Sequence, residues 1–168
     1  MKLQSHWYAL HTASRAEKKI KQQLDARGVV NYLPMRTELH QWSDRKKRVT
    51  LPLITGYIFV CVPVGDLRHL LPLPGICNVL SEDGHPAAIP DKQIRQLELA
   101  ERYCSEELRL IEAPLPVGSA VRVTAGPLCG VEGELVSYEG NDCIALRIDN
   151  LGCALLRMDQ NCIESIKK

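Results

Sequence analysis

The stretch that most constrains the fold is residues 51–62, LPLITGYIFVCV, which contains the only Phe of the chain. Its length and its β-branched and aromatic residues predict a buried strand rather than a helix. Alternate residues of a strand face opposite sides, so Tyr57 and Phe59 share one face while Ile58 and Val60 share the other. Both faces are apolar, which predicts that both are covered. The chain's own helices can cover one face, which leaves the other for a second protein.

Composition narrows the class of protein. The chain has 168 residues, 45% of them hydrophobic, which suits one domain or two small ones. No apolar run reaches membrane-spanning length, and the N-terminus lacks the apolar core of a secretion signal, so we expect a cytoplasmic protein without membrane contact. The number of Cys residues is seven, and none forms a CxxC pair. We therefore expect reduced, mostly buried thiols, with no metal site and no cofactor.

Charge is distributed unevenly along the chain. Residues 1–50 carry eleven Lys and Arg against four Asp and Glu, an excess of seven, although the whole chain has a formal net charge of only +1. The remaining residues therefore carry a net charge of −6 (ten basic, sixteen acidic). A basic front part on a near-neutral protein indicates one localised surface for a polyanion.

Local patterns in the first two thirds of the chain predict a small α+β domain with an antiparallel sheet flanked by helices. Ser14 and Glu17 have the spacing of a capping box, and Gly28 is suited to end the helix that follows. The dense basic run is expected at the tip of a hairpin. The expected elements, in order, are a strand at 6–12, a helix from 14 to about 27, an extended region at 29–42, a hairpin tip at 43–48, strands at 49–62 and 76–80, and a helix from 90 to about 106.

Beyond this helix the pattern changes. Two prolines and a loss of periodicity predict a linker at residues 108–116, between a first domain at 1–107 and a second at 117–168. In the second domain the hydrophobic period becomes two, with turn residues between short runs. Five short strands in so few residues predict a small, SH3-like five-stranded β-barrel. The strands are expected at 120–125, 131–138, 143–148, 153–158 and 163–166.

No catalytic arrangement is recognisable. The chain has no GxSxG, GxGxxG, P-loop or HExxH motif. Its five His residues are scattered, and His6 and His11 point to opposite faces of a strand, so they form a poor metal pair. A pairing of Cys61 or Cys77 with a distant His would make a cysteine enzyme, but nothing near either thiol favours a thiolate. We therefore expect a binding protein rather than an enzyme, with an apolar strand face and a basic front as its candidate surfaces.

At this point two groups of motifs resemble a known family. Residues 6–10 (HWYAL), 33–35 (LPM) and 52–60 (PLITGYIFV) resemble the N-terminal (NGN) domain of the NusG family of transcription elongation factors. Residues 121–133 (VRVTAGPLCGVEG) resemble the KOW motif of its C-terminal domain. The stretch 48–62 is more similar to specialised paralogues such as RfaH and the UpxY regulators than to the general factor.

The resemblance implies a function and a partner. The N-terminal domain of the family docks an apolar concavity on the clamp helices of RNA polymerase and suppresses pausing or termination. Buried aromatic anchors are the expected energetic centre of such an interface. The resemblance implies that Tyr8 joins Tyr57 and Phe59 from a neighbouring strand. The polymerase-binding residues implied for this chain are Tyr8, Leu33, Ile54, Tyr57 and Phe59.

Specialised members also touch the non-template DNA strand, through the start of the first helix and a nearby loop. Such contacts need cations for phosphates and flat groups for bases. The matching residues are His11, Arg15, Lys18, Lys19, Arg68 and His69. The KOW domain of the family recruits a ribosomal protein, the Rho terminator or RNA, with Leu128 and Cys129 as candidates here. The alternative function is that of a ribosome- or RNA-associated KOW protein.

Overall fold

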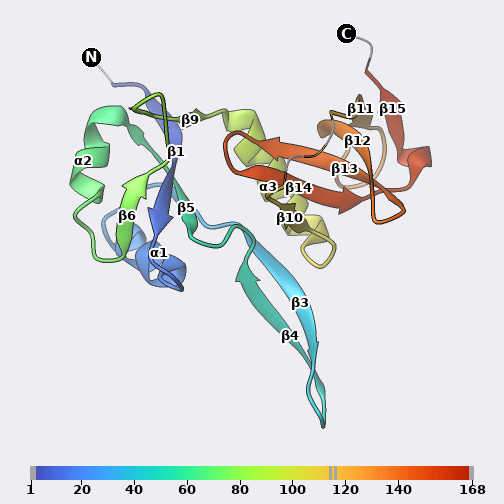
Figure 1. Cartoon of the computed structure of the whole chain (residues 1–168), viewed down its shortest axis with the longest axis horizontal. Coiled ribbons are helices and arrows are strands. Elements are labelled where there is room, and N and C mark those ends of the chain that lie inside the picture. Colours follow the sequence, from blue (N-terminus) through green and yellow to red (C-terminus); the bar gives the residue numbers. More distant parts are fainter. Residues whose placement is uncertain (1–2, 114, 116, 167–168) are drawn as a thin grey trace. The chain divides into compact units, whose positions relative to one another are not determined.

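The computed structural model describes residues 3–113, 115 and 117–166 (Figure 1). Tertiary contacts divide the chain into two compact units. Unit 1 comprises Met1–Pro34 and Ile54–Asp91, and unit 2 comprises Met35–Leu53 and Lys92–Lys168. This division differs from the domains expected at 1–107 and 117–168, and those boundaries stay a prediction.

Unit 1 is built on a five-stranded antiparallel sheet. Its strand order is β2-β5-β1-β6, and β9 also pairs with β1. The sequence predicted β1 (Ser5–Thr12) and β6 (Ile76–Val79) as strands. The members are β1 (Ser5–Thr12), β2 (Asn31–Tyr32), β5 (Tyr57–Pro63), β6 (Ile76–Val79) and β9 (Ala88–Ile89), with a small separate hairpin of β7 (Ser81–Glu82) and β8 (His85–Pro86).

The strand predicted at 49–62 is divided in two. β4 (Lys46–Pro52) ends at the proline, and β5 begins at Tyr57 after a turn. Gly56 has φ +84° in this turn, a left-handed conformation that favours glycine. The Gly56 carbonyl accepts a hydrogen bond from the Thr12 N–H at 2.8 Å, which holds the turn against the end of β1. The prediction of one continuous strand was therefore wrong, because the turn chemistry around Gly56 interrupts it.

Helix α1 (Glu17–Ala26) ends as predicted and begins differently. At its C-terminus the Gly28 N–H bonds to the Asp25 carbonyl and the Val29 N–H to the Leu24 carbonyl, which is a Schellman motif. At its N-terminus Ala16 is the cap and makes no side-chain capping bond. The predicted capping box is therefore wrong. The buried Glu17 carboxylate instead accepts the Gly56 N–H at 2.8 Å.

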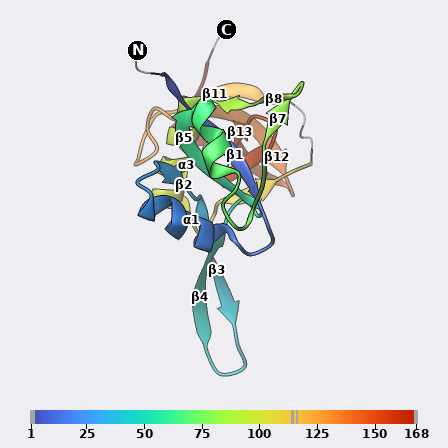
Figure 2. The ribbon, with the colours of Figure 1, turned by 90° about the vertical axis from the view of Figure 1, so that its left-hand side faces the viewer.

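Helix α1 and the short α2 (Leu67–Leu70), which follows a 3₁₀ turn at Val64–Asp66, lie on the same side of the unit 1 sheet (Figures 1 and 2). The register pairs Tyr8 with Val60 and Leu10 with Ile58, and all four residues are buried. Residues paired in an antiparallel sheet share a face. We therefore assign this fully buried face to the side that the two helices cover.

Unit 2 contains the remaining hairpin, the long helix and the C-terminal strands. β3 (Met35–Gln41) and β4 form a two-stranded sheet that joins neither of the larger sheets. Helix α3 (Asp91–Cys104) matches the helix predicted from 90 to about 106, and it buries Ile94, Leu97 and Ala100.

The C-terminal strands form a six-stranded antiparallel sheet in the order β10-β14-β13-β12-β11-β15. All five predicted strands are present, but β10 lies within the expected linker, and the sheet path is open rather than a closed barrel. Pairing of Ile144 with Leu156 and of Leu146 with Ala154 gives one buried face, as the alternation predicted. The strands are β10 (Arg109–Ile111), β11 (Ser119–Val123), β12 (Glu132–Tyr138), β13 (Asn141–Ile148), β14 (Gly152–Arg157) and β15 (Ile163–Ser165), with a 3₁₀ turn at Gln160–Cys162 before the last.

One ion pair organises the middle of this sheet. Arg147 donates from Nε and Nη2 to the two carboxylate oxygens of Glu134, each at 2.8 Å. This bidentate geometry is the stronger kind of charge-assisted contact. The Glu134 carboxylate raises the pKa of Arg147, and it also accepts the Gly118 N–H at 3.1 Å.

Polar contacts join α3 to the C-terminal sheet within unit 2. Gln93 donates to the Asp149 carboxylate and accepts from its N–H, both at 2.9 Å. Lys92 pairs with Glu132, whose N–H donates to the Gln96 amide oxygen at 3.0 Å. None of the helices in the described part of the chain is long and apolar enough to span a membrane.

Candidate functional site

The face of the unit 1 sheet opposite to Tyr8 carries a row of rings. The register pairs Ala9 with Phe59 and His11 with Tyr57, and β2 places Tyr32 opposite Phe59. The His11 and Tyr57 rings have centroids 5.1 Å apart, and the Tyr32 and Phe59 rings are stacked with centroids 6.2 Å apart. We call this the aromatic face. Its rings belong to Trp7, His11, Tyr32, Tyr57 and Phe59.

Burial differs among these rings. Phe59 is fully buried, whereas Trp7, His11, Tyr32 and Tyr57 are all partly exposed. The Cys61 thiol lies on the same face, opposite Trp7, and burial raises its pKa, with a smaller contribution from the Asp91 carboxylate. The aromatic face therefore has one buried ring, that of Phe59, surrounded by rings that are partly exposed to solvent. The opposite face has no such exposed rings at the paired positions described above.

The five residues expected to bind polymerase have different positions. Tyr57 is partly exposed and Phe59 is buried beside it on the aromatic face. Leu33 is 5% exposed and Ile54 is 2% exposed. Four of the five are thus not on the surface of this conformation, and the role of all five stays a prediction.

Tyr8 requires a correction, because it does not share a face with Tyr57 and Phe59. It pairs with Val60 on the opposite face and is 4% exposed, and burial raises the pKa of its phenol. His11 occupies the place expected for it, next to Tyr57. Alternation along each strand was correct, but the sequence did not show which face of β1 meets which face of β5. Trp7, His11 and Tyr32 were therefore missed as members of this surface.

The cations expected to contact DNA lie at the start of α1. Arg15, Lys18 and Lys19 are exposed, and Arg15 has φ +60°, a left-handed conformation for the residue before the cap. Glu17 lies among them in sequence, but it is turned inward to bond Gly56. The local surface is therefore basic although the sequence there contains a carboxylate.

Arg68 and His69 lie on α2, also exposed, and Arg68 Nε donates to His69 Nε2 at 3.3 Å. Both helices are on the same side of the sheet (Figure 2). His11 differs from the other five candidates, because its ring lies against Tyr57 on the aromatic face. The structure thus brings His11 to the candidate protein-binding surface, while the other candidates are on the helices.

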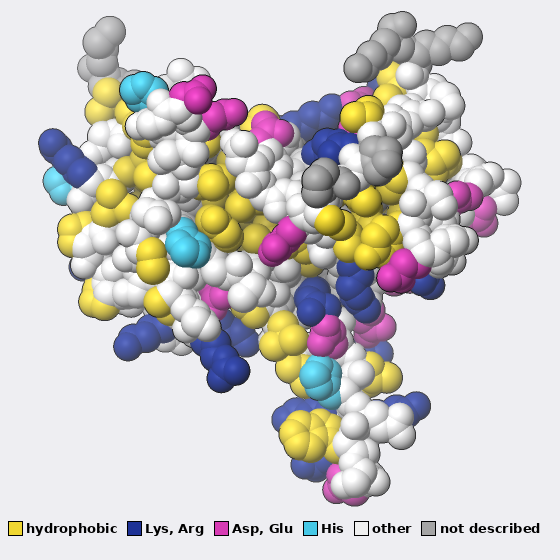
Figure 3. Space-filling model, in the orientation of Figure 1, with side chains coloured by type: hydrophobic (Ala, Val, Ile, Leu, Met, Phe, Trp, Pro, Cys, Tyr) yellow, Lys and Arg dark blue, Asp and Glu magenta, His cyan; other side chains and the backbone are white. Residues whose placement is uncertain are grey.

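The hairpin of β3 and β4 forms a third surface, which we call the basic ribbon (residues 35–52). All residues from Leu39 to Arg48 are exposed. Lys and Arg side chains gather around its free end, beside exposed hydrophobic side chains (Figure 3). The sequence predicted a strongly basic turn here, and the structure adds a large exposed ring, that of Trp42.

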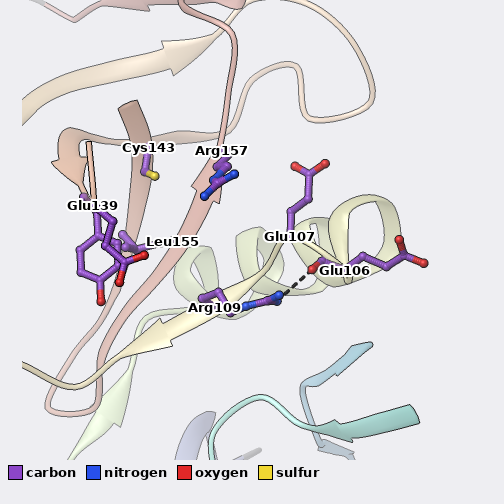
Figure 4. Close-up of a pocket in the computed structure, with 8 residues that line it drawn as sticks. Glu106, Glu107, Arg109, Glu139, Cys143, Leu155 and Arg157 are labelled. Atoms are coloured by element: carbon purple, nitrogen blue, oxygen red, sulfur yellow. Dashed lines mark hydrogen bonds between the residues drawn. The ribbon is translucent and has the colours of Figure 1, made fainter. Parts of the chain in front are cut away.

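A small hollow of about 280 Å³ lies in unit 2, near the end of α3 (Figure 4). It is lined by carboxylates, arginines and the Cys143 thiol, and Arg109 donates to the Glu106 carbonyl at 2.8 Å within it. Burial raises the pKa of Cys143, which disfavours the thiolate that a nucleophile needs. The lining residues are Glu106, Glu107, Arg109, Tyr138, Glu139, Cys143, Leu155 and Arg157. This mixture of opposite charges offers no recognisable catalytic arrangement.

Comparison with known proteins identifies relatives of the chain. Residues 5–98, more than half of the chain, match the family model described as "Transcription termination factor nusG". Among solved structures, the chain is similar to one described as "Domain interaction in Thermotoga maritima NusG", with 22% identity, a TM-score of 0.55, and 98% of each chain covered. This likeness shows a shared fold.

A second solved structure, "Crystal Structure of MjSpt4:Spt5 complex conformation A", has 15% identity over 96% of this chain and 99% of the other, at a TM-score of 0.33. That score is too low to support an argument. Among curated proteins, none matches the chain. The matched family model ends at residue 98, so the resemblance of residues 121–133 to a KOW motif stays a prediction.

Proposed function

This chain belongs to the NusG family of transcription factors, and we propose that it is an elongation and antitermination factor that binds the clamp helices of RNA polymerase. It acts in the cytoplasm, keeps the polymerase in its elongating form, and suppresses pausing or termination. The observation that carries the proposal is the aromatic face, since partly exposed rings on a rigid sheet are the usual centre of a protein interface.

The structure of this face refines the proposed contact. Tyr57, Tyr32 and Trp7 are partly exposed and available to a helical partner. Phe59 is fully buried on the same face, and its ring stacks on that of Tyr32. An aromatic side chain supplies a large contact area and loses little conformational freedom on binding. Tyr8 pairs with Val60 on the opposite face and is 4% exposed, so it does not support this contact in the present conformation, and its role stays a prediction.

In the same proposal the nearby cations contact the exposed non-template DNA strand. Arg15, Lys18 and Lys19 at the start of α1, with Arg68 and His69 on α2, supply charge for phosphates. His11 supports Tyr57 and so acts with the polymerase contact. The C-terminal sheet recruits a further partner, a ribosomal protein, Rho or RNA. Leu128 is buried, so Cys129, which is exposed, is the better candidate for that contact.

The test of the polymerase contact is the substitution Tyr57→Ala in the full chain. We expect it to weaken capture of core RNA polymerase by roughly thirtyfold, the size of an interface hot spot of about 2 kcal/mol. Tyr103→Ala is the matched control, because Tyr103 is an exposed tyrosine on α3, 52% accessible. Capture is measured by pull-down, and folding by circular dichroism. Unchanged capture by a folded Tyr57→Ala protein would exclude the aromatic face as the docking surface.

The DNA contact is tested separately with Lys18→Glu. We expect this variant to lose affinity for paused elongation complexes more at low salt than at high salt, because exposed charges are screened by ions. Binding is measured at several ionic strengths. A loss of affinity that does not depend on salt would argue against a phosphate contact at Lys18.

The alternative, a ribosome- or RNA-associated KOW protein, predicts different partners. In that case structured RNA or ribosomal subunits bind the full chain, while core polymerase does not. A pausing assay on templates with different leader sequences distinguishes the two, because only a polymerase-binding factor changes the lifetime of a pause.

A further inference from the structure

The basic ribbon presents two different faces, which follow from its register. Seven residue pairs run from Met35 opposite Pro52 to Gln41 opposite Lys46, and the Trp42 N–H donates to the Arg45 carbonyl at 2.8 Å. Paired residues share a face, so one face near the turn carries Trp42, Arg45 and Lys47 together. This arrangement places an aromatic ring and two cations on one side of the same turn.

Ion pairs involve residues at the base of the ribbon, whereas the turn at its tip carries three cations against one carboxylate, Asp44. Glu38 pairs with Arg36 and His40, and Arg48 pairs with Glu106 at 3.0 Å. The Thr37 N–H also bonds to the Ser105 carbonyl at 3.1 Å. By contrast, no ion pair is found for the tip cations among residues 3–113, 115 and 117–166. These tip cations are Arg45, Lys46 and Lys47, and all are exposed.

The tip also exposes apolar surface that the fold does not use. Trp42 is 59% exposed and Leu39 is 62% exposed. A two-stranded hairpin is at best marginally stable alone, so rings on it usually pack across the strands. The Trp42 backbone is fixed by its bond to Arg45, yet its ring remains largely in water. Lysines that merely protect an open strand edge from aggregation would not explain this ring.

The chemistry of the tip matches one class of ligand. Uncompensated Lys and Arg attract phosphates, and an exposed indole offers a surface on which an unpaired base can stack. In a duplex the bases are stacked on each other and their faces are not available. An acidic protein would satisfy the cations but not the ring. We propose that the tip of the basic ribbon binds single-stranded nucleic acid, with a base on Trp42 and phosphates on Arg45 and Lys47, the two cations of the same face.

This site is separate from the proposed polymerase and DNA contacts. The aromatic face and the cations of α1 and α2 belong to unit 1, whereas the ribbon belongs to unit 2. The two proposals can therefore fail independently. Variants of the ribbon are expected to retain capture of core polymerase, which Tyr57→Ala is expected to weaken.

Fluorescence of Trp42 gives a direct test. The chain has two Trp residues, so a full-length Trp7→Phe protein reports on Trp42 alone. The probes are an oligodeoxythymidylate and an oligouridylate of about 12 nucleotides, a duplex of the same length and inorganic polyphosphate. We expect both single strands to quench the fluorescence, because a stacked base contacts the indole. A difference between the two strands would identify DNA or RNA as the preferred source.

Substitutions at the tip separate stacking from charge. In the otherwise unchanged protein, Trp42→Ala is expected to weaken binding of the single strands about tenfold, and Trp42→Phe to restore part of it. Arg45→Gln with Lys47→Gln is expected to lower the slope of log affinity against log salt by about 1.4, or about 0.7 for each cation. The matched control is Arg27→Gln with Arg102→Gln. It removes two exposed cations outside the ribbon, one at the C-terminal end of α1 and one in α3.

Three outcomes would overturn the proposal. The first is binding of the duplex or of polyphosphate as tightly as of the single strands. The second is quenching that is absent while binding occurs. The third is an equal loss of salt dependence in the control variant and in the Arg45→Gln, Lys47→Gln variant. Thermal unfolding of each variant shows whether it is folded, and the exposure of the tip predicts that all are.

Discussion

Two antiparallel strand pairs in this protein have the same length and opposite surroundings. β1 and β5 pair at seven positions, and so do β3 and β4. Ile58, Phe59 and Val60 in β5 are fully buried, whereas the ribbon is exposed from Leu39 to Arg48. Hydrogen-bonded pairing alone therefore gives a strand its shape, while packing against other elements gives it most of its stability. The unpacked pair keeps its side chains available for ligands.

The largest expected difference between the two strand pairs is in the free energy of unfolding when one aromatic ring is removed from each. Phe59→Ala should lower the free energy of unfolding by about 3–5 kcal/mol, because it leaves a cavity in a packed core. Trp42→Ala should change it by less than about 0.5 kcal/mol, since most of the ring is already in water. Denaturant unfolding measures both. Similar values for the two variants would break the comparison, because they would mean that the ribbon is packed in solution.

The next effect concerns one carboxylate in each region. Glu17→Ala should cost about 1–3 kcal/mol, because it leaves the Gly56 N–H without its buried partner. Glu38→Ala on the ribbon should cost at most about 1 kcal/mol, since its partners Arg36 and His40 remain hydrated. Unfolding by urea measures both values. An equal cost at the two sites would show that hydration does not distinguish them.

The smallest effect is a dependence on pH within the ribbon. A hydrogen bond from His40, with a smaller contribution from Arg36, holds the pKa of Glu38 below its ordinary value of 4.5. A carboxyl group whose pKa is lower in the folded than in the unfolded protein stabilises the fold at pH values above its unfolded pKa. This stabilisation is lost as the pH falls through the pKa of the folded state. The ribbon should therefore loosen in acid below about pH 4, and Glu38→Gln should remove this dependence.

Nuclear magnetic resonance can follow this change through the amide signals of β3 and β4 during an acid titration. The signals of β1 and β5 serve as the internal reference, because neither strand contains a carboxylate. A titration in which both strand pairs change together would indicate global unfolding, and the separate behaviour of the ribbon would then be disproved.

Sequence patterns predicted the local elements of this protein well. The Gly28 helix end and the five C-terminal strands both depend on neighbouring residues, and both are present. Predictions failed where a side chain forms a hydrogen bond with a group that is distant in the sequence instead of the local bond that its spacing suggests. Glu17 has the spacing of a capping box, yet it bonds Gly56, which is far away in the chain.

The candidate site shows the same limit. Alternation along β5 puts Tyr57 and Phe59 on one face, and alternation along β1 puts Trp7 and His11 on one face. It does not show whether these two faces lie on the same side of the sheet. That depends on the register of β1 against β5, which joins residues about fifty positions apart. A shift of one residue would have put Tyr8 beside Phe59 instead. The burial of Leu33 and Ile54 likewise depends on tertiary packing rather than on local pattern.

The sequence by itself determined the family, the alternating strands, the C-terminal end of α1 and the concentration of cations before β5. Each of these depends on residue type and short spacing, which local chemistry controls. Only the tertiary structure decided which rings share the aromatic face, where Glu17 finds its partner, and that the basic ribbon is exposed from Leu39 to Arg48. These features depend on contacts between residues that are distant in the sequence. Local propensity does not include the free energies of such contacts.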